Sequence, residues 1–215
     1  MEKARFLDIP TFTYPQILGG RDISELKTEI IRKSIHILIA FAPTLAAINR
    51  PLTMSILMVG TLGYAYMEYL RFYGIKVPIV SSLTNMASRT RDNGRFVMGP
   101  VTLGLGALAA LLFYPSPAAA IGIYALAFGD GLASLVGKFF GKWRPAFLAG
   151  KSIEGSMACF AAVLVSAYAV SGSMHIALVA AITASVVEAL PLEDYDNLAI
   201  PVAVGLAVQM ASHTL

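Results

Sequence analysis

The sequence predicts an all-α membrane protein, a polytopic bundle of about seven transmembrane helices with its N-terminus in the cytoplasm. Of the 215 residues, 57% are hydrophobic and only 13% are charged, whereas soluble domains carry about 25% charged residues. The apolar stretches approach the roughly 20 residues that cross a bilayer as a helix. Lys and Arg, in turn, gather in alternate loops.

The chain is expected to consist of an N-terminal segment followed by one membrane domain. Residues 1–23 contain two prolines and a Gly-Gly pair, which predict a loop or a surface segment. Residues 24–215 are expected to form a single transmembrane catalytic domain, whose first helix, over 24–48, has Ser24 as its cap. The polar residues 73–97 predict a loop, and whether it is a lid or a surface helix stays open. Further helices are predicted over 52–72, 98–113, 118–139, 152–170, 174–190 and 196–213.

The positive charge predicts the orientation. Of the 16 Lys and Arg residues, only Arg50 falls on the side opposite the N-terminus. Because Lys and Arg mark cytoplasmic loops, we expect the other loops, and the active site, to face the cytoplasm at the cell (cytoplasmic) membrane. The basic residues flank apolar segments and form no separate domain, so the pI near 9.0 does not indicate nucleic-acid binding.

Ionisable residues in membrane helices are costly and are therefore functional candidates. Glu29, Arg32, Lys33 and His36 are spaced so that they share one face of the first helix. Their cations can bind phosphates at the cytoplasmic end. The alternative is a basic collar at the membrane surface with an ion pair from Glu29.

A second cluster lies in the fourth predicted helix. Asp130, Ser134, Gly137 and Gly141 recur on one face. Small residues allow close approach of a helix or a ligand, and helix packing alone explains the glycines. A carboxylate in an apolar helix, however, requires a partner, either a basic side chain or a metal ion.

The third cluster follows the basic loop, at the start of the fifth predicted helix. Ser152 is a suitable N-cap, and a helix N-terminus beside Lys151 favours anions. Gly150-Lys151-Ser152 is also similar to the end of a phosphate-binding P-loop. That motif is rejected, because Pro145 stands where it requires glycine and no strand precedes it.

A fourth cluster is acidic and precedes the last predicted helix. Its oxygen-bearing side chains suit Mg²⁺, although an acidic turn shaped by Pro191 is the alternative. Glu68, near the end of the second helix, is a further polar candidate at the same membrane face. The acidic cluster consists of Glu188, Glu193, Asp194, Asp196 and Asn197.

Together these clusters fit phosphoryl or nucleotidyl transfer to a membrane-dissolved substrate, a chemistry that depends on positioning and charge neutralisation. They also resemble the CTP-dependent lipid alcohol (polyprenol) kinases, which include dolichol kinase, phytol kinase and the yeast-type diacylglycerol kinase. The resemblance spans about residues 29–201. It rests on these motifs: Arg32-Lys33-x-x-His36, Gly129-Asp130-Gly131-x-Ala133-Ser134-x-x-Gly137-x-x-x-Gly141, Lys151-Ser152-x-Glu154-Gly155-Ser156, Glu188, and Asp196-Asn197 with Pro201.

The resemblance implies transfer of the γ-phosphate of CTP to the hydroxyl of an isoprenoid alcohol or diacylglycerol, with Mg²⁺ or a similar divalent cation. It implies catalytic roles for Arg32, Lys33, His36, Asp130 and Lys151, with Asp130 or His36 as the proton acceptor. It implies nucleotide binding by Arg32, Lys33, Ser134, Gly137, Lys151, Ser152 and Gly155. The expected metal ligands are Asp130 and one or more of Glu154, Asp194 and Asp196. Glu29, Glu68, Glu188 and Asn197 complete the expected polar site.

Two other functions stay open at this point. A phosphatidate cytidylyltransferase would use CTP but attack its α-phosphate, and the C-terminal signature of that family is not found in this sequence. A transporter would be expected to have polar residues at the bilayer midplane or broken helices in repeats. The choice of lipid alcohol and any protein partners are not predicted.

Overall fold

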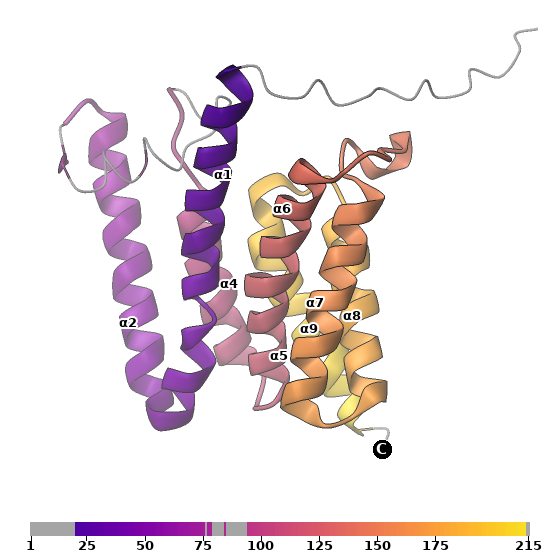
Figure 1. Cartoon of the computed structure of the whole chain (residues 1–215). Coiled ribbons are helices and arrows are strands. Elements are labelled where there is room, and N and C mark those ends of the chain that lie inside the picture. The colour runs from indigo at the N-terminus through magenta and orange to yellow at the C-terminus, as the bar shows by residue number, and fades with distance from the viewer. Residues whose placement is uncertain (1–19, 76, 79–83, 85–93, 214–215) are drawn as a thin grey trace, which may run out of the picture.

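The computed structural model describes residues 20–75, 77–78, 84 and 94–213, and every regular element within these ranges is a helix (Figure 1). Residues 1–19 of the predicted N-terminal segment 1–23 and most of the predicted loop 73–97 lie outside the described residues, whereas residues 20–23 are helical. The described helices stand roughly side by side as a bundle. The prediction of an all-α architecture is therefore confirmed for the described residues.

The first helix begins earlier than the sequence predicted. Helix α1 spans Gly20–Leu38, so Ser24 lies inside the helix and is not its cap. That expectation rested on the capping preference of serine, but the residues between Gly20 and Ser24 include no proline and can continue the helix. Helix α1 ends with a tight turn, in which the amide of Ala40 donates to the carbonyl of Ile37 at 3.0 Å.

Helix α2 spans Phe41–Phe72 and contains a reversal of the chain at Asn49 (Figure 1). Asn49 has non-helical angles, φ −151° and ψ 94°, and its side-chain oxygen accepts the amide hydrogen of Leu52 at 3.0 Å. Asn49 therefore caps the second half of α2. Pro51 fits there because the amides of a first helical turn have no carbonyl partner within the helix, so the amide hydrogen that proline lacks is not needed. The predicted separation of helices 24–48 and 52–72 is found at this residue.

The next elements are α4, which spans Gly99–Phe113, and a rod made of three pieces. The rod consists of α5 over Ala118–Tyr124, a π-helical turn η2 over Ala125–Asp130, and α6 over Gly131–Phe139. The rod matches the helix predicted over 118–139. The π turn was not predicted, and Asp130 is its last residue.

The last three helices match their predicted bounds within one residue. They are α7 over Ile153–Ser171, α8 over Met174–Ala189 and α9 over Asp196–His213. Ser152 caps α7 as predicted, because its side chain accepts the amide hydrogen of Gly155 at 3.1 Å. Two short 3₁₀ turns precede α7 and α9, η3 over Ala146–Leu148 and η4 over Glu193–Tyr195.

Helix α9 lies at the centre of the packing and contacts α4, α5 and α8, while α2 packs outside on α4 and α1 packs on α6. The approach to α9 is close because glycines face its backbone. A Cβ atom at Gly106 would lie 2.1 Å from the carbonyl oxygen of Asn197, and one at Gly122 would lie 2.6 Å from that of Pro201. The glycines of α4 and α5 therefore fix where α9 begins.

Three helical stretches are long and apolar enough to cross a membrane: Lys27–Phe72, Ala118–Phe139 and Ile153–Ser171. The first has 46 residues, enough for two crossings of roughly 20 residues each. Helices α4 and α8 are apolar but shorter. Large apolar side chains such as Leu62, Val165 and Val186 are exposed on the bundle. These features indicate a membrane protein, whereas seven crossings and a cytoplasmic N-terminus stay predictions.

Replacing Gly106 with alanine is expected to lower the melting temperature by several degrees, because the added methyl group meets the backbone of α9. Overpacking of this kind costs roughly 1–3 kcal/mol. The matched control is Gly60→Ala in α2, where a Cβ meets no atom within 4 Å. Cys159 is the sole cysteine and is fully buried, so labelling by a thiol-reactive fluorophore reports unfolding. Equal melting temperatures for the two variants would contradict the close packing of α4 on α9.

Candidate functional site

A cavity of about 420 Å³ opens at one end of the bundle. The C-terminal ends of α6 and α8 and the N-terminal ends of α7 and α9 meet at this end (Figure 1). Arg50, the basic residue predicted for the other side, is not among the residues of this end. Its guanidinium donates to the carbonyl of Tyr114 at 2.9 Å, just beyond the C-terminus of α4. The cavity is lined by Arg32, Asp130, Ala133, Ser134, Gly137, Lys138, Arg144, Ala149, Gly150, Lys151, Ser152, Gly155, Glu188, Pro191, Glu193 and Asp196.

Asp130 is held by two side chains of α1. The ammonium group of Lys33 donates to the Asp130 carboxylate, and Nδ1 of His36 lies 3.1 Å from the same oxygen. Lys33 is only 1% exposed and His36 3%. The carboxylate in the apolar rod thus has a basic side chain as a partner. Because Lys33 and His36 are not among the described residues that line the cavity, their direct contact with phosphate stays a prediction.

Glu29 joins α1 to α6 through hydrogen bonds. It is fully buried and accepts from Arg32, from the hydroxyl of Ser134 at 2.5 Å and from the ammonium group of Lys138 at 2.8 Å. The three donors line the cavity. Glu29 therefore fixes two cations and a hydroxyl on one wall.

Arg144 ties the loop between α6 and α7 into the cavity wall. Its guanidinium donates to the carbonyl of Gly137 at 2.6 Å and to that of Gly150 at 2.5 Å. Gly150 has φ 91°, a left-handed conformation that glycine adopts without strain. Glu154 secures the same loop from α7, because its carboxylate accepts the amide hydrogen of Lys142 at 3.0 Å.

The small residues of the second and third motifs bring α6 and α7 together. A Cβ atom at Gly155 would lie 2.7 Å from the carbonyl oxygen of Ala133, and one at Gly137 would lie 3.0 Å from the hydroxyl oxygen of Ser152. Helix packing therefore accounts for both glycines. Both were predicted to bind nucleotide and both line the cavity, so the packing of α6 on α7 also shapes this part of its wall.

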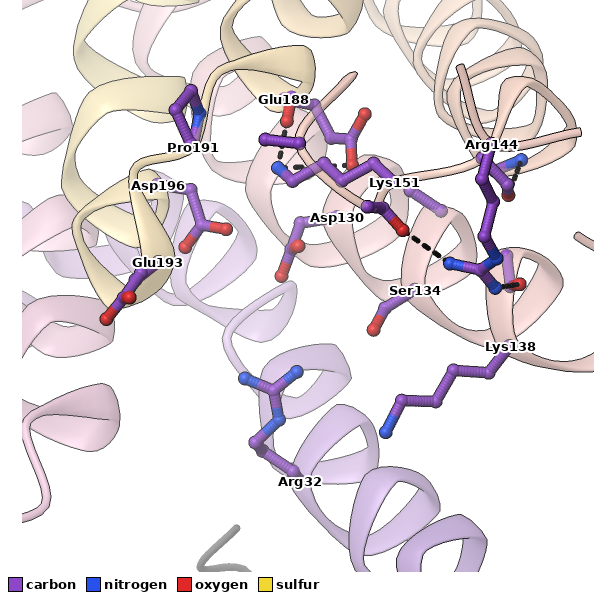
Figure 2. Close-up of a pocket in the computed structure, with 16 residues that line it drawn as sticks. Arg32, Asp130, Ser134, Lys138, Arg144, Lys151, Glu188, Pro191, Glu193 and Asp196 are labelled. Atoms are coloured by element: carbon purple, nitrogen blue, oxygen red, sulfur yellow. Dashed lines mark hydrogen bonds and ion pairs between the residues drawn. The ribbon is translucent and has the colours of Figure 1, made fainter. Parts of the chain in front are cut away.

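Carboxylates gather on the other wall. Lys151 donates to the backbone carbonyl of Glu188 and lies 3.4 Å from its carboxylate, which also accepts from the hydroxyl of Ser156 at 3.1 Å. Asp196 lines the cavity, as Asp130 does. In the view of Figure 2, Glu193 and Asp196 lie on one side, Lys138 and Arg144 on the other, and Asp130 between them.

The carboxylates fit a metal ion that is shared with phosphates better than one held by protein alone. Among the described residues, no three His, Cys, Asp or Glu side chains are grouped so that they could hold a metal ion. Mg²⁺, however, usually takes one or two carboxylates and completes its shell with water and substrate phosphates. Asp130 and Asp196 line the same cavity, so the protein provides the number of carboxylates that such an ion usually takes.

The remaining predicted residues lie outside the lining of the cavity. Glu154 anchors the loop, and Asp194 interacts electrostatically with Arg32. Asn197 donates to the hydroxyl of Thr102 at 3.0 Å, which joins α9 to α4. Glu68 is fully buried and accepts from the guanidinium of Arg71 at 2.6 Å and from the amide of Val97 at 2.8 Å.

Two cations of the cavity were not predicted as site residues. Lys138 follows Ser134 by four residues, so the helical period that grouped Asp130 with Ser134 would also have placed it on the same face. Arg144 lies in an irregular loop, where no periodicity relates it to either helix. Sequence spacing carries no signal for that residue.

The sequence is similar to proteins from an archaeon and from plants. It is 30% identical over 189 residues to the uncharacterized protein MJ1137 of Methanocaldococcus jannaschii, which covers 84% of this chain and 92% of that protein. It is 27% identical over 149 residues to a probable chloroplastic phytol kinase of Triticum aestivum, which covers 61% of this chain and 50% of the relative. It is also 27% identical over 157 residues to the chloroplastic phytol kinase 1 of Arabidopsis thaliana, which covers 64% and 51%.

This chain thus spans about half the length of the two plant relatives. No protein-family model matches it. No solved structure matches it either. The match to the archaeal protein covers most of both chains.

Lys33 and Asp130 are expected to be strongly coupled in stability. Lys33→Met leaves a buried carboxylate without its ammonium partner, and Asp130→Asn leaves a buried ammonium, so each change is expected to cost about 3–5 kcal/mol. The double variant removes both charges and is expected to be destabilised by clearly less than the sum. Thermal unfolding followed at Cys159 measures all three. Additive effects would contradict a direct buried ion pair.

Proposed function

This chain belongs to the same family as the protein MJ1137 of Methanocaldococcus jannaschii, and we propose that it is a membrane kinase that phosphorylates lipid alcohols. The observation that carries this proposal is the cavity in which Arg32, Lys138, Arg144 and Lys151 face carboxylates at one end of an apolar bundle. Cations can neutralise a polyphosphate, while the apolar surface of the bundle gives access to a lipid. The two plant relatives named phytol kinases support the same chemistry.

We propose CTP as the phosphate donor and an isoprenoid alcohol, such as phytol, geranylgeraniol or a polyprenol, or diacylglycerol as the acceptor. The choice of CTP is supported by the resemblance of the Gly129-Asp130 and Lys151-Ser152 motifs to those of the CTP-dependent lipid alcohol kinases. The choice of a lipid acceptor is supported by the apolar helices and by the plant relatives. The gathering of Lys and Arg at the end that holds the cavity supports an active site facing the cytoplasm at the cell membrane.

The proposed reaction is a single displacement at phosphorus. The hydroxyl oxygen of the lipid attacks the γ-phosphorus of CTP, the bond from that phosphorus to its bridging oxygen breaks, and CDP leaves. Arg32 and Lys151 line the cavity and neutralise the phosphate oxygens. Asp130 also lines it, whereas His36 does not, so Asp130 is the proposed acceptor of the hydroxyl proton. Lys33 then serves to hold Asp130 ionised and in place.

A divalent cation fits this proposal. Asp130 and Asp196 would hold Mg²⁺ together with phosphate oxygens, and the ion would supply charge neutralisation. In this assignment the carboxylates of Glu154 and Asp194 support the loop and Arg32, respectively. We therefore expect EDTA to abolish activity and excess Mg²⁺ to restore it.

The function is tested with purified protein in detergent, Mg²⁺, and CTP that carries distinguishable labels on its α- and γ-phosphates. Lipid alcohols, diacylglycerol and phosphatidate are offered together. We expect only the γ label to enter the lipid fraction, and the labelled product identifies the acceptor. Entry of the α label would identify a cytidylyltransferase instead. Transfer from none of CTP, ATP and GTP would leave a transporter as the better reading.

Asp130→Asn is expected to lower the rate of transfer by at least about 100-fold, which is the lower end of the range that a general base contributes to a reaction rate. Because this variant is also destabilised, the double variant with Lys33→Met shows whether chemistry or folding is responsible: it should be inactive at a temperature where Cys159 remains protected. The control is His175→Gln, an exposed residue at the start of α8, far along the helix from the cavity. Near-normal activity of Asp130→Asn would refute its assigned role.

A further inference from the structure

We propose that Glu29 is a positioning residue that holds Arg32 and Lys138 ready to bind the phosphate groups of the nucleotide. This inference rests on the proposed function, because it assigns a polyphosphate to the cavity. It concerns a residue that touches no substrate and acts through its neighbours. The argument starts from the place of Glu29 in the wall.

Glu29 lies behind the wall of the cavity. It is fully buried and is not among the described residues that line the cavity, whereas its hydrogen-bond donors Arg32, Ser134 and Lys138 all line it. An anion in the cavity can therefore contact these donors without contacting the carboxylate of Glu29. The anion and Glu29 contact the same side chains without taking each other's place.

The donors retain hydrogen-bonding capacity beyond Glu29. An ammonium group has three N–H donors and a guanidinium has five. Arg32 gives Glu29 a hydrogen bond from one terminal nitrogen, and its buried Nε has no hydrogen-bond partner among the described residues. Lys138 is the more exposed of the two cations, with 38% of its side chain accessible. Both can bind phosphate oxygens while they remain bonded to Glu29.

Glu29 also sets the separation of the two cations. Arg32 comes from α1 and Lys138 from α6, and the single carboxylate bonds to both. Without this anchor, the long side chain of Lys138 can turn toward water and its orientation must be fixed at each binding event, which lowers affinity. A matched arrangement elsewhere allows this role to be isolated.

Glu68 provides that control. Like Glu29, it is fully buried and binds an arginine three residues later, Arg71. Its other donors include the amide of Val97 and the hydroxyl of Thr84 at 3.5 Å, and none of these residues lines the cavity. Glu68→Gln therefore removes an equivalent buried charge and leaves the wall of the cavity intact.

The experiment measures binding of inorganic tripolyphosphate by calorimetry, and KM and kcat for CTP, in the wild type, Glu29→Gln and Glu68→Gln. For Glu29→Gln we expect tripolyphosphate affinity to fall about tenfold and KM to rise about tenfold, with kcat changed much less, since charge-assisted hydrogen bonds contribute about this much. For Glu68→Gln we expect a lower melting temperature and unchanged binding constants.

Tighter binding by Glu29→Gln would show that Glu29 competes with the anion, and unchanged binding would show a purely structural role; either result overturns the proposal. If Glu29→Gln does not fold, Glu29→Asp keeps the charge but withdraws it by one methylene, and it should also weaken binding. A wild type that transfers no phosphate refutes the kinase, while the tripolyphosphate measurements still decide the role of Glu29.

Discussion

The buried contact between Lys33 and Asp130 is the interaction on which the rest of the site depends. It joins α1 to the rod that runs from α5 through η2 to α6, and the described contacts of α1 with the bundle run to this rod. A charge in an apolar interior is tolerated only with a partner of opposite sign. The buried ion pair therefore fixes the position of α1, and with it the position of Arg32 on the cavity wall.

The cavity is built by packing as much as by charge. Gly137 and Gly155 let α6 and α7 approach closely, and Arg144 then joins the loop between these helices to α6 by binding the carbonyl of Gly150 in the loop and that of Gly137 in α6. The basic side chains that line the cavity are thereby held in place by hydrogen bonds to other groups of the protein. Such a site is organised before any ligand enters, which reduces the reorganisation that binding a polyphosphate requires.

The sequence predicted most of the helices because long apolar runs bounded by Pro, Gly and charged residues report directly on local structure. It did not predict the turn at Ile39–Ala40 or the π turn over Ala125–Asp130, because most residues of these turns are also compatible with a regular α-helix. In the site, helical spacing correctly grouped the residues of α1 and those of α6. It could not reveal that Lys33 faces Asp130 while Arg32 faces the cavity, because pairing between distant segments leaves no mark in spacing.

The π turn of η2 has a consequence for how this rod is read as a helix. An α-helix advances about 100° per residue, whereas a turn closed by i→i+5 hydrogen bonds advances less. The six residues Ala125–Asp130 therefore shift the angular phase of everything that follows relative to everything before. Gly122 can face α9 while Asp130 faces α1, two directions that an unbroken α-helix would have to reconcile through its fixed pitch. The π turn thus rotates the side chains of α6 relative to those of α5, and the two ends of the rod can pack against different helices.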